Sequence, residues 1–173
     1  MEMTLRFYGD PVLREKAEKV TEFDEALHKT IEDMATLMYK EDGAGLAGPQ
    51  VGLNKQIFIE DDGSGSGWRA YINPEIICFS DEKDVAEEGC LSIPDIFENV
   101  ERSKTIKVRY QLMDGTQKEE EVSSYLARII QHETDHLNGV LFIDHISKLK
   151  KRLLKKKLDM IKAKAKEVYM NAG

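Results

Sequence analysis

Two of the chain's 4 histidines lie in the segment His132-Glu133-Thr134-Asp135-His136. Histidines four residues apart project from one face of a helix, so both imidazole rings can reach a single metal ion. The glutamate beside the first histidine can then act on a water molecule at that ion. This spacing therefore predicts a metal site rather than two unrelated surface histidines.

A metal site of this kind needs a third protein ligand and one position left open for water. The candidates are Cys90, Cys78, His145 and several carboxylates. Cys90 follows a glycine, which lets the backbone approach closely. Cys78 lies in an apolar run and is expected to be a buried thiol, whereas His145 lies beyond the predicted helix and is expected at the surface. The residues alone leave the choice of third ligand open.

The two histidines lie in a predicted helix over residues 125–137, which ends at Gly139 as a C-terminal cap. An earlier helix begins after Asp24, a good N-cap residue, and ends at Asp42-Gly43. A last helix begins near Ser147 and carries lysines on its polar faces. Its expected apolar stripe consists of Leu149, Leu153, Leu158, Ile161, Ala165 and Val168.

The middle of the chain contains short runs of residues that favour β-strands. The expected strands are residues 56–60, 68–73, 75–79, 85–88, 104–112 and 116–122. A flexible loop over residues 61–67 joins the first two, and a turn at Asp114-Gly115 joins the last two. These elements indicate an α+β fold, with small mixed or antiparallel sheets packed around the helix that carries the histidines, and with N-terminal and C-terminal helices.

The chain has 173 residues and a net charge of −7, but the charge is unevenly distributed. Residues 148–173 contain ten Lys or Arg and two acidic residues, a charge of +8, so residues 1–147 carry −15. No apolar run approaches the roughly 20 residues needed to span a membrane, and the first residues do not resemble a signal peptide. Two cysteines do not make a disulfide framework. We expect a cytoplasmic protein with reduced thiols and no membrane segment.

Three segments of the chain resemble, in order and spacing, the three motifs of the peptide deformylases. The segments are Gly43-Ala44-Gly45-Leu46-Ala47-Gly48-Pro49-Gln50, Glu88-Gly89-Cys90-Leu91-Ser92 and Gln131-His132-Glu133-Thr134-Asp135-His136-Leu137. The likeness extends over nearly the whole chain, including residues 9–14 and Asn73-Pro74. These enzymes remove the N-formyl group from the initiator methionine of nascent bacterial and organellar chains by hydrolysis, which releases formate. The resemblance implies this activity.

The resemblance also implies a site built around one divalent metal ion. Its ligands are then Cys90, His132 and His136. The family pattern makes Glu133 the acid and base, and it holds the oxyanion with the side-chain amide of Gln50 and the backbone N–H of Leu91. Fe²⁺ is the family's usual native metal, although Zn²⁺, Ni²⁺ and Co²⁺ also occupy such sites. One thiolate and two imidazoles suit each of these ions.

From the resemblance we expect the methionine side chain to enter an apolar pocket, and the peptide backbone to bind as an extended strand. The residues expected to bind substrate are Gly43, Ala44, Gly45, Leu46, Gly89, Tyr125, Leu126 and Ile129. Ala44 and Gly48 are smaller than the residues usual in the family. These two differences bear on the width of the methionine pocket and the stiffness of its loop.

Polar residues next to the three motifs are expected to support the ligands. Ser92 and Asp135 are candidates for fixing the ligand orientation. Arg102 is expected to pair with Glu88 or Asp42, because an acidic loop near a metal needs a compensating charge.

The charge asymmetry divides the chain into two expected parts. Residues 1–147 form the catalytic domain, and residues 148–173 form a basic amphipathic helix that packs on this domain or extends from it. The lysines are solvated and offset the acidic body. The resemblance also implies that these lysines bind ribosomal RNA, close to the place where nascent formyl-methionyl peptides leave the ribosome. We expect a monomer.

Three other functions are compatible with parts of the sequence. A zinc endopeptidase also uses two histidines and a glutamate on a helix, but the cysteine candidate and the short chain count against it. A ribosome-binding module without turnover would keep the fold, yet no essential residue of the motifs is missing. A cysteine hydrolase using Cys90 would leave the paired histidines unexplained. Hydrolysis of formyl-methionyl peptides is therefore the function that the sequence favours.

Overall fold

The structure is a computed structural model that describes residues 2–172. Its α-helices are α1 (Glu25–Lys40), α2 (Ser124–Leu137), α3 (Lys148–Leu153) and α4 (Lys155–Ala172). Its strands are β1 (Gly45–Ala47), β2 (Ile57–Glu60), β3 (Arg69–Phe79), β4 (Lys83–Cys90), β5 (Ile93–Ser103), β6 (Thr105–Gln111) and β7 (Gln117–Ser123). Among these residues, no helix is both long enough and apolar enough to cross a membrane.

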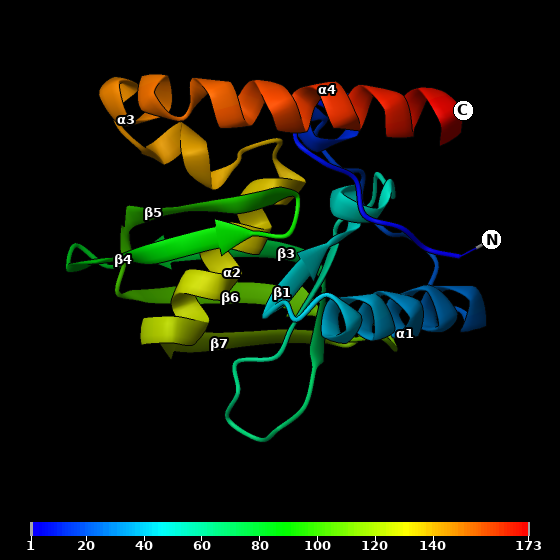
Figure 1. The fold of residues 1–173 in the computed structure, drawn as a ribbon. Coiled ribbons are helices and arrows are strands. Elements are labelled where there is room, and N and C mark those ends of the chain that lie inside the picture. Colours follow the sequence, from blue (N-terminus) through cyan, green and yellow to red (C-terminus); the bar gives the residue numbers. More distant parts are fainter. Residues whose placement is uncertain (1, 173) are drawn as a thin grey trace.

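The strands form two antiparallel sheets (Figure 1). One sheet has five strands in the order β1-β2-β3-β6-β7, and the other is the two-stranded pair β4-β5. The strand pairings in both sheets are antiparallel. Together with the helices, these sheets confirm the α+β class that the sequence predicted.

Helix α2 lies between the two sheets and contacts both of them. One face buries Ala127 and Ile130 against aromatic side chains of the large sheet, where the rings of Phe58 and Tyr71 stack with centroids 4.6 Å apart. The other face is tied to the small sheet, because the Arg128 guanidinium donates hydrogen bonds to backbone carbonyls of β4 and β5. This central position lets α2 carry the His-Glu segment into the interior.

The start of α1 and the ends of α1 and α2 agree with the prediction from the sequence. The Asp24 carboxylate accepts a hydrogen bond from the Leu27 N–H and caps α1, which ends near the predicted Asp42-Gly43. After α2, Gly139 has a φ of +74°, and a Cβ atom there would lie 2.6 Å from the carbonyl oxygen of Arg14. Only glycine combines this left-handed backbone with so close an approach.

The strand pattern differs from the prediction in three places, the first of which is the short strand β1, which was not expected. Strand β5 was not among the expected strands, because its apolar residues do not alternate; Asp95 has a φ of +64°, which breaks the period of two. Residues 68–73 and 75–79 were expected as two strands, but residues 69–79 form the single strand β3. A positive φ of 51° at Asn73 and a register shift after Ile72 hide its continuity.

The expected burial of Cys78 is wrong, since its side chain is exposed near the end of β3. The register of β3 against β6 shifts between Ile76 and Cys78. A shift of this kind changes the face of the sheet to which the following side chains point. The apolar run around Cys78 therefore does not make it a core residue.

The C-terminal helix begins after Ser147 as predicted, but it is interrupted at Leu154, which separates α3 from α4. Leu158 and Ala165 are buried, and Leu158 packs against β5. Leu149 and Leu153 are 63% and 76% exposed, however, and Val168 is 38% exposed. The expected stripe is wrong at these positions; the interruption at Leu154 places Leu149 and Leu153 on a separate short helix, out of phase with the buried face of α4. Helix α4 lies along one side of the molecule, over the N-terminal segment (Figure 1).

Candidate metal centre

Three side chains from two elements converge on one point of the interior. Cys90 is the last residue of β4, and His132 and His136 lie one turn apart on α2. The Cys90 Sγ lies 3.3 Å from His136 Nε2, and the ligand atoms of all three residues lie within 4.8 Å of one another. The structure therefore brings Cys90, rather than Cys78 or His145, to the two histidines.

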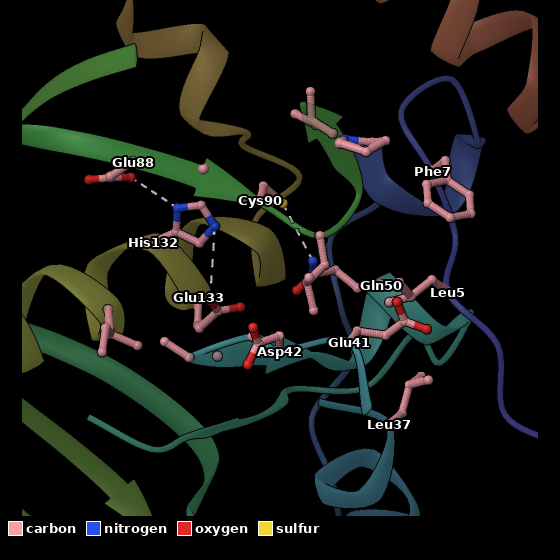
Figure 2. A pocket seen from close by; sticks show the side chains of 18 of the residues that line it. Leu5, Phe7, Leu37, Glu41, Asp42, Gln50, Glu88, Cys90, His132 and Glu133 are labelled. Atoms are coloured by element: carbon pink, nitrogen blue, oxygen red, sulfur yellow. Dashed lines mark hydrogen bonds and ion pairs between the residues drawn. The ribbon is translucent and has the colours of Figure 1, made fainter. Parts of the chain in front are cut away.

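His132 is held in one orientation by a buried carboxylate. Its Nδ1 lies 2.9 Å from Glu88 Oε1, which leaves Nε2 facing the converging donors (Figure 2). Arg102 donates from Nε and Nη2 to the two oxygens of Glu88, at 2.9 Å each, and Arg128 Nη1 donates at 2.7 Å. Each oxygen of Glu88 thus faces two donors. Of the two expected partners of Arg102, Glu88 and Asp42, the structure shows Glu88.

Burial alone would raise the pKa of Glu88, because it disfavours the charged form. The hydrogen bonds from Arg102 and His132 outweigh this effect and hold the pKa well below its usual range. Glu88 is therefore a permanent carboxylate. It can accept the Nδ1–H of His132 and so keep Nε2 free as a ligand.

The chemistry of these donors fits a divalent metal ion. Bonds of roughly 2.0–2.3 Å from imidazole nitrogen and thiolate sulfur to one tetrahedral ion place neighbouring donors about 3.5 Å apart. The 3.3 Å between Cys90 Sγ and His136 Nε2 is close to this separation. One sulfur and two nitrogen donors also leave a position for a water molecule or a substrate.

Glu133 points into the same space from α2. It is buried, and its Oε1 has no hydrogen-bond partner among residues 2–172. Its Oε2 lies 3.9 Å from His132 Nε2, and a Cβ atom on Gly45 would lie only 2.6 Å from that oxygen. Burial raises the pKa of Glu133 to about 7. This carboxyl group can therefore accept and return a proton near neutral pH.

The Gln50 amide is buried and fixed on both sides. Its Oε1 accepts a hydrogen bond from the Ala47 N–H at 2.9 Å, so its nitrogen faces the metal ligands. The Nε2 group donates to Ser92 Oγ at 3.1 Å and lies 3.5 Å from Cys90 Sγ. Ser92 thus orients Gln50 rather than a metal ligand directly. Leu91, which follows Cys90, lines the same space.

A cavity of about 890 Å³ opens beside these residues (Figure 2). Six of the expected substrate-binding residues line it, namely Gly43, Ala44, Gly45, Gly89, Tyr125 and Ile129. Leu46 and Leu126 do not, contrary to the prediction. Leu46 is fully buried in the core beside α1, and Leu126 packs against the core on the large sheet. Both therefore support the walls from behind.

Gly48 does not line the cavity, so its small size does not widen it. A Cβ atom at this position would lie 2.8 Å from the carbonyl oxygens of Leu53 and Lys55. Close packing of the backbone within the loop thus leaves no room for a side chain at this position. Ala44, the other residue that is smaller than usual in the family, does line the cavity and therefore affects its width.

Several cavity residues were not identified from the sequence. Phe97 is 60% exposed, and its ring covers Gly89 so closely that a Cβ there would lie 2.6 Å away. Arg128 and the N-terminal residues Leu5 and Phe7 also line the cavity. An aromatic residue within the polar run of β5 was the one available signal for Phe97. Leu5 and Phe7 enter only through the tertiary fold.

Comparisons with known proteins agree with this geometry. A family model for polypeptide deformylase matches residues 3–152. The chain belongs to the peptide deformylase family. It is 57% identical over 154 residues to the peptide deformylase of Thermotoga maritima, covering 89% of this chain and 93% of that one. It is 43% identical over 166 residues to that of Fusobacterium nucleatum, covering 95% of each.

Solved structures of the family have the same fold. The crystal structure of the Thermotoga maritima peptide deformylase matches with a TM-score of 0.82 at 56% identity, covering 85% of this chain and 99% of that one. A Synechococcus elongatus peptide deformylase in complex with actinonin matches with a TM-score of 0.85 at 41% identity, covering 90% and 87%. The chain is therefore a hydrolase that removes the N-formyl group from nascent peptides, and its family uses a single divalent metal ion. Membership of this family argues against the three other functions considered from the sequence, namely a zinc endopeptidase, a ribosome-binding module without turnover and a cysteine hydrolase.

The two cysteines provide a matched test of the metal ligands. Cys90→Ser should reduce bound metal from about one ion per chain to a small fraction, because the thiolate is lost. Cys78→Ser, at an exposed position of β3, should retain the wild-type content. The measurement is metal analysis of both variants after anaerobic purification. Full metal content in the Cys90 variant would show that another residue is the ligand.

Proposed function

We propose that Cys90, His132 and His136 hold one divalent ion at which this chain hydrolyses formyl-methionyl peptides. The observation that carries the proposal is the buried Glu133 carboxyl group beside the three donors: its Oε2 lies 3.9 Å from His132 Nε2, and its Oε1 has no hydrogen-bond partner in the described part of the chain. When bound, the ion acts as a Lewis acid and lowers the pKa of water towards neutrality. Glu133 takes the proton from the attacking water and then delivers it to the departing amine nitrogen.

The developing oxyanion is stabilised by the Gln50 Nε2 group and the Leu91 backbone N–H. The support for Gln50 is its fixed amide, whose oxygen is already engaged by Ala47. A preorganised donor of this kind contributes roughly 2.7–4 kcal/mol to transition-state stabilisation. Because Gln50 is held before substrate arrives, it needs no reorganisation during the reaction.

The methionine side chain occupies the cavity beside Tyr125 and Ile129. The peptide backbone extends along the Gly43–Gly45 segment on one side and Gly89 on the other, where glycines allow close approach. The lack of space between Gly45 and Glu133 favours a formyl hydrogen over the methyl of an acetyl group. Backbone recognition of this kind suits an enzyme that serves many different nascent chains.

The physiological ion in this proposal is Fe²⁺, which Zn²⁺, Ni²⁺ or Co²⁺ can replace, because thiolate and imidazole donors suit all four. All residues of the proposed site come from a single chain, so we propose an active monomer. Its substrates are made on ribosomes, and the proposed compartment is therefore the cytoplasm.

We further propose that residues 1–147 form the catalytic domain and that the C-terminal helices contact ribosomal RNA. Residues 148–173 carry a charge of +8. Helix α4 packs on the body through Leu158 and Ala165, which leaves lysines such as Lys156, Lys157 and Lys164 exposed. An exposed row of lysines on a docked helix can bind phosphates without disturbing the fold.

Substitution Glu133→Gln tests the catalytic proposal. The change preserves shape, so the metal ligands should stay in place while the proton acceptor is lost. Since one group serves both proton transfers, turnover should fall by about 10⁴-fold, the upper end for general acid–base catalysis. The measurement is formate release from formyl-Met-Ala-Ser at equal metal content. A metal-replete variant that keeps more than about a tenth of wild-type turnover contradicts the assigned role.

The RNA contact can be tested with two triple variants of equal net charge. Lys156, Lys157 and Lys164 changed to Gln should weaken binding to purified ribosomes and reduce its dependence on salt. The matched control changes Lys16, Lys19 and Lys118, exposed lysines of the body, to Gln. Turnover of formyl-Met-Ala-Ser should not change in either variant. Equal ribosome binding by both variants would disprove a specific role for α4.

A further inference from the structure

A second cavity, of about 490 Å³, lies beside α2 and is lined by Arg102, Asp135 and His145. Asp135 precedes His136 in the sequence, but its side chain belongs to this second cavity. His145 comes from the turn that follows α2 and is exposed. None of the three contributes a donor to the proposed metal site, yet hydrogen bonds connect them to it.

The connection is a continuous series of short contacts. His145 Nε2 lies 2.9 Å from Asp135 Oδ2, and the same oxygen accepts a hydrogen bond from Arg102 Nη1 at 2.6 Å. The other two nitrogens of the Arg102 guanidinium donate to both oxygens of Glu88 at 2.9 Å. Glu88 Oε1 in turn lies 2.9 Å from Nδ1 of His132.

The burial of these groups shows which member is least constrained. The side chains of Arg102 and Glu88 are each 5% exposed, whereas that of Asp135 is 26% exposed and that of His145 is 37% exposed. Arg102 Nη1 also lies 3.4 Å from His145 Nε2, so without His145 that contact is lost and Asp135 can turn towards solvent, away from Nη1. Because a guanidinium group is planar and rigid, a tilt at Nη1 also moves the two bonds to Glu88. That movement changes the orientation of His132.

We propose that His145 is a positioning residue that, through Asp135 and Arg102, fixes the Glu88 carboxylate behind His132 and so slows metal loss. The inference rests on the proposed ligation by His132. Its physical basis is that partners behind a metal-bound histidine fix its ring orientation and its basicity. The series begins in a solvent-exposed cavity and ends at the metal site, so a surface residue determines how firmly the ion is held.

The test compares cobalt-loaded full-length variants. His145→Leu removes the hydrogen bond, and His145→Gln retains an N–H donor at a similar distance. His28→Leu is the matched control, because that histidine hydrogen-bonds the Met113 carbonyl and lines neither this cavity nor the one beside the metal site. The measurements are the rate of Co²⁺ loss to excess chelator and the visible absorption of the cobalt–thiolate site. Melting temperatures verify that all three variants are folded.

We expect His145→Leu to lose Co²⁺ roughly 10-fold faster than wild type, at the lower end of the effect of such partners, with an altered absorption spectrum. His145→Gln and His28→Leu should behave as wild type. Equal rates and spectra for wild type and His145→Leu would overturn the inference, as would a Gln variant that behaves like the Leu variant. If the wild-type protein neither retains Co²⁺ nor releases formate, the proposed function itself fails.

Discussion

A carboxylate buried between the two-stranded sheet and helix α2 organises this molecule. Glu88 cannot remain charged in the interior unless donors surround it, and Arg102, Arg128 and His132 provide them. These partners come from β5 and α2, so one charge joins three elements. Removing one partner of such a buried pair costs about 3–5 kcal/mol. Because Cys90 lies two residues beyond Glu88 on β4, the same interaction places the sulfur donor beside the histidine donors.

The two glutamates near the metal centre differ in ways that match different roles. Glu88 has two donors at each oxygen, and its pKa lies well below the usual range. Glu133 is equally buried, but Oε1 has no partner in the described chain, and burial raises its pKa to about 7. Environments that separate the pKa values of neighbouring carboxyl groups are typical of acid–base sites. Glu88, with hydrogen-bond donors at both oxygens, holds a metal ligand in place, and Glu133, with one oxygen that has no partner in the described residues, can accept and release protons.

Local signals predicted the parts of the structure that local physics determines. The Asp24 cap, the Gly139 helix end and the spacing of His132 and His136 on one face all follow from neighbouring residues. The class of fold and the family were also accessible from the sequence. The extent of β5 was hidden by the positive φ at Asp95, which lies where the register of β4 against β5 shifts, a feature of strand pairing rather than of an apolar pattern.

Other features depend on contacts between distant segments, which one sequence does not specify. Leu46 and Leu126 were expected in the pocket because of their neighbours, but each packs into a core behind it. Arg128 was not identified, since its partners Glu88 and Val100 lie 40 and 28 residues away in the sequence. The interruption at Leu154 likewise reverses the expected burial of Leu149 and Leu153.

X-ray absorption spectroscopy at the metal edge tests the central claim most directly, that one ion is held by Cys90, His132 and His136. The sample is the wild-type protein, purified anaerobically and then loaded with Zn²⁺. The account predicts one sulfur neighbour at about 2.3 Å and two imidazole nitrogens at about 2.0–2.1 Å, with an oxygen neighbour completing the shell. A spectrum without a sulfur neighbour, or with fewer than two imidazoles, would contradict it.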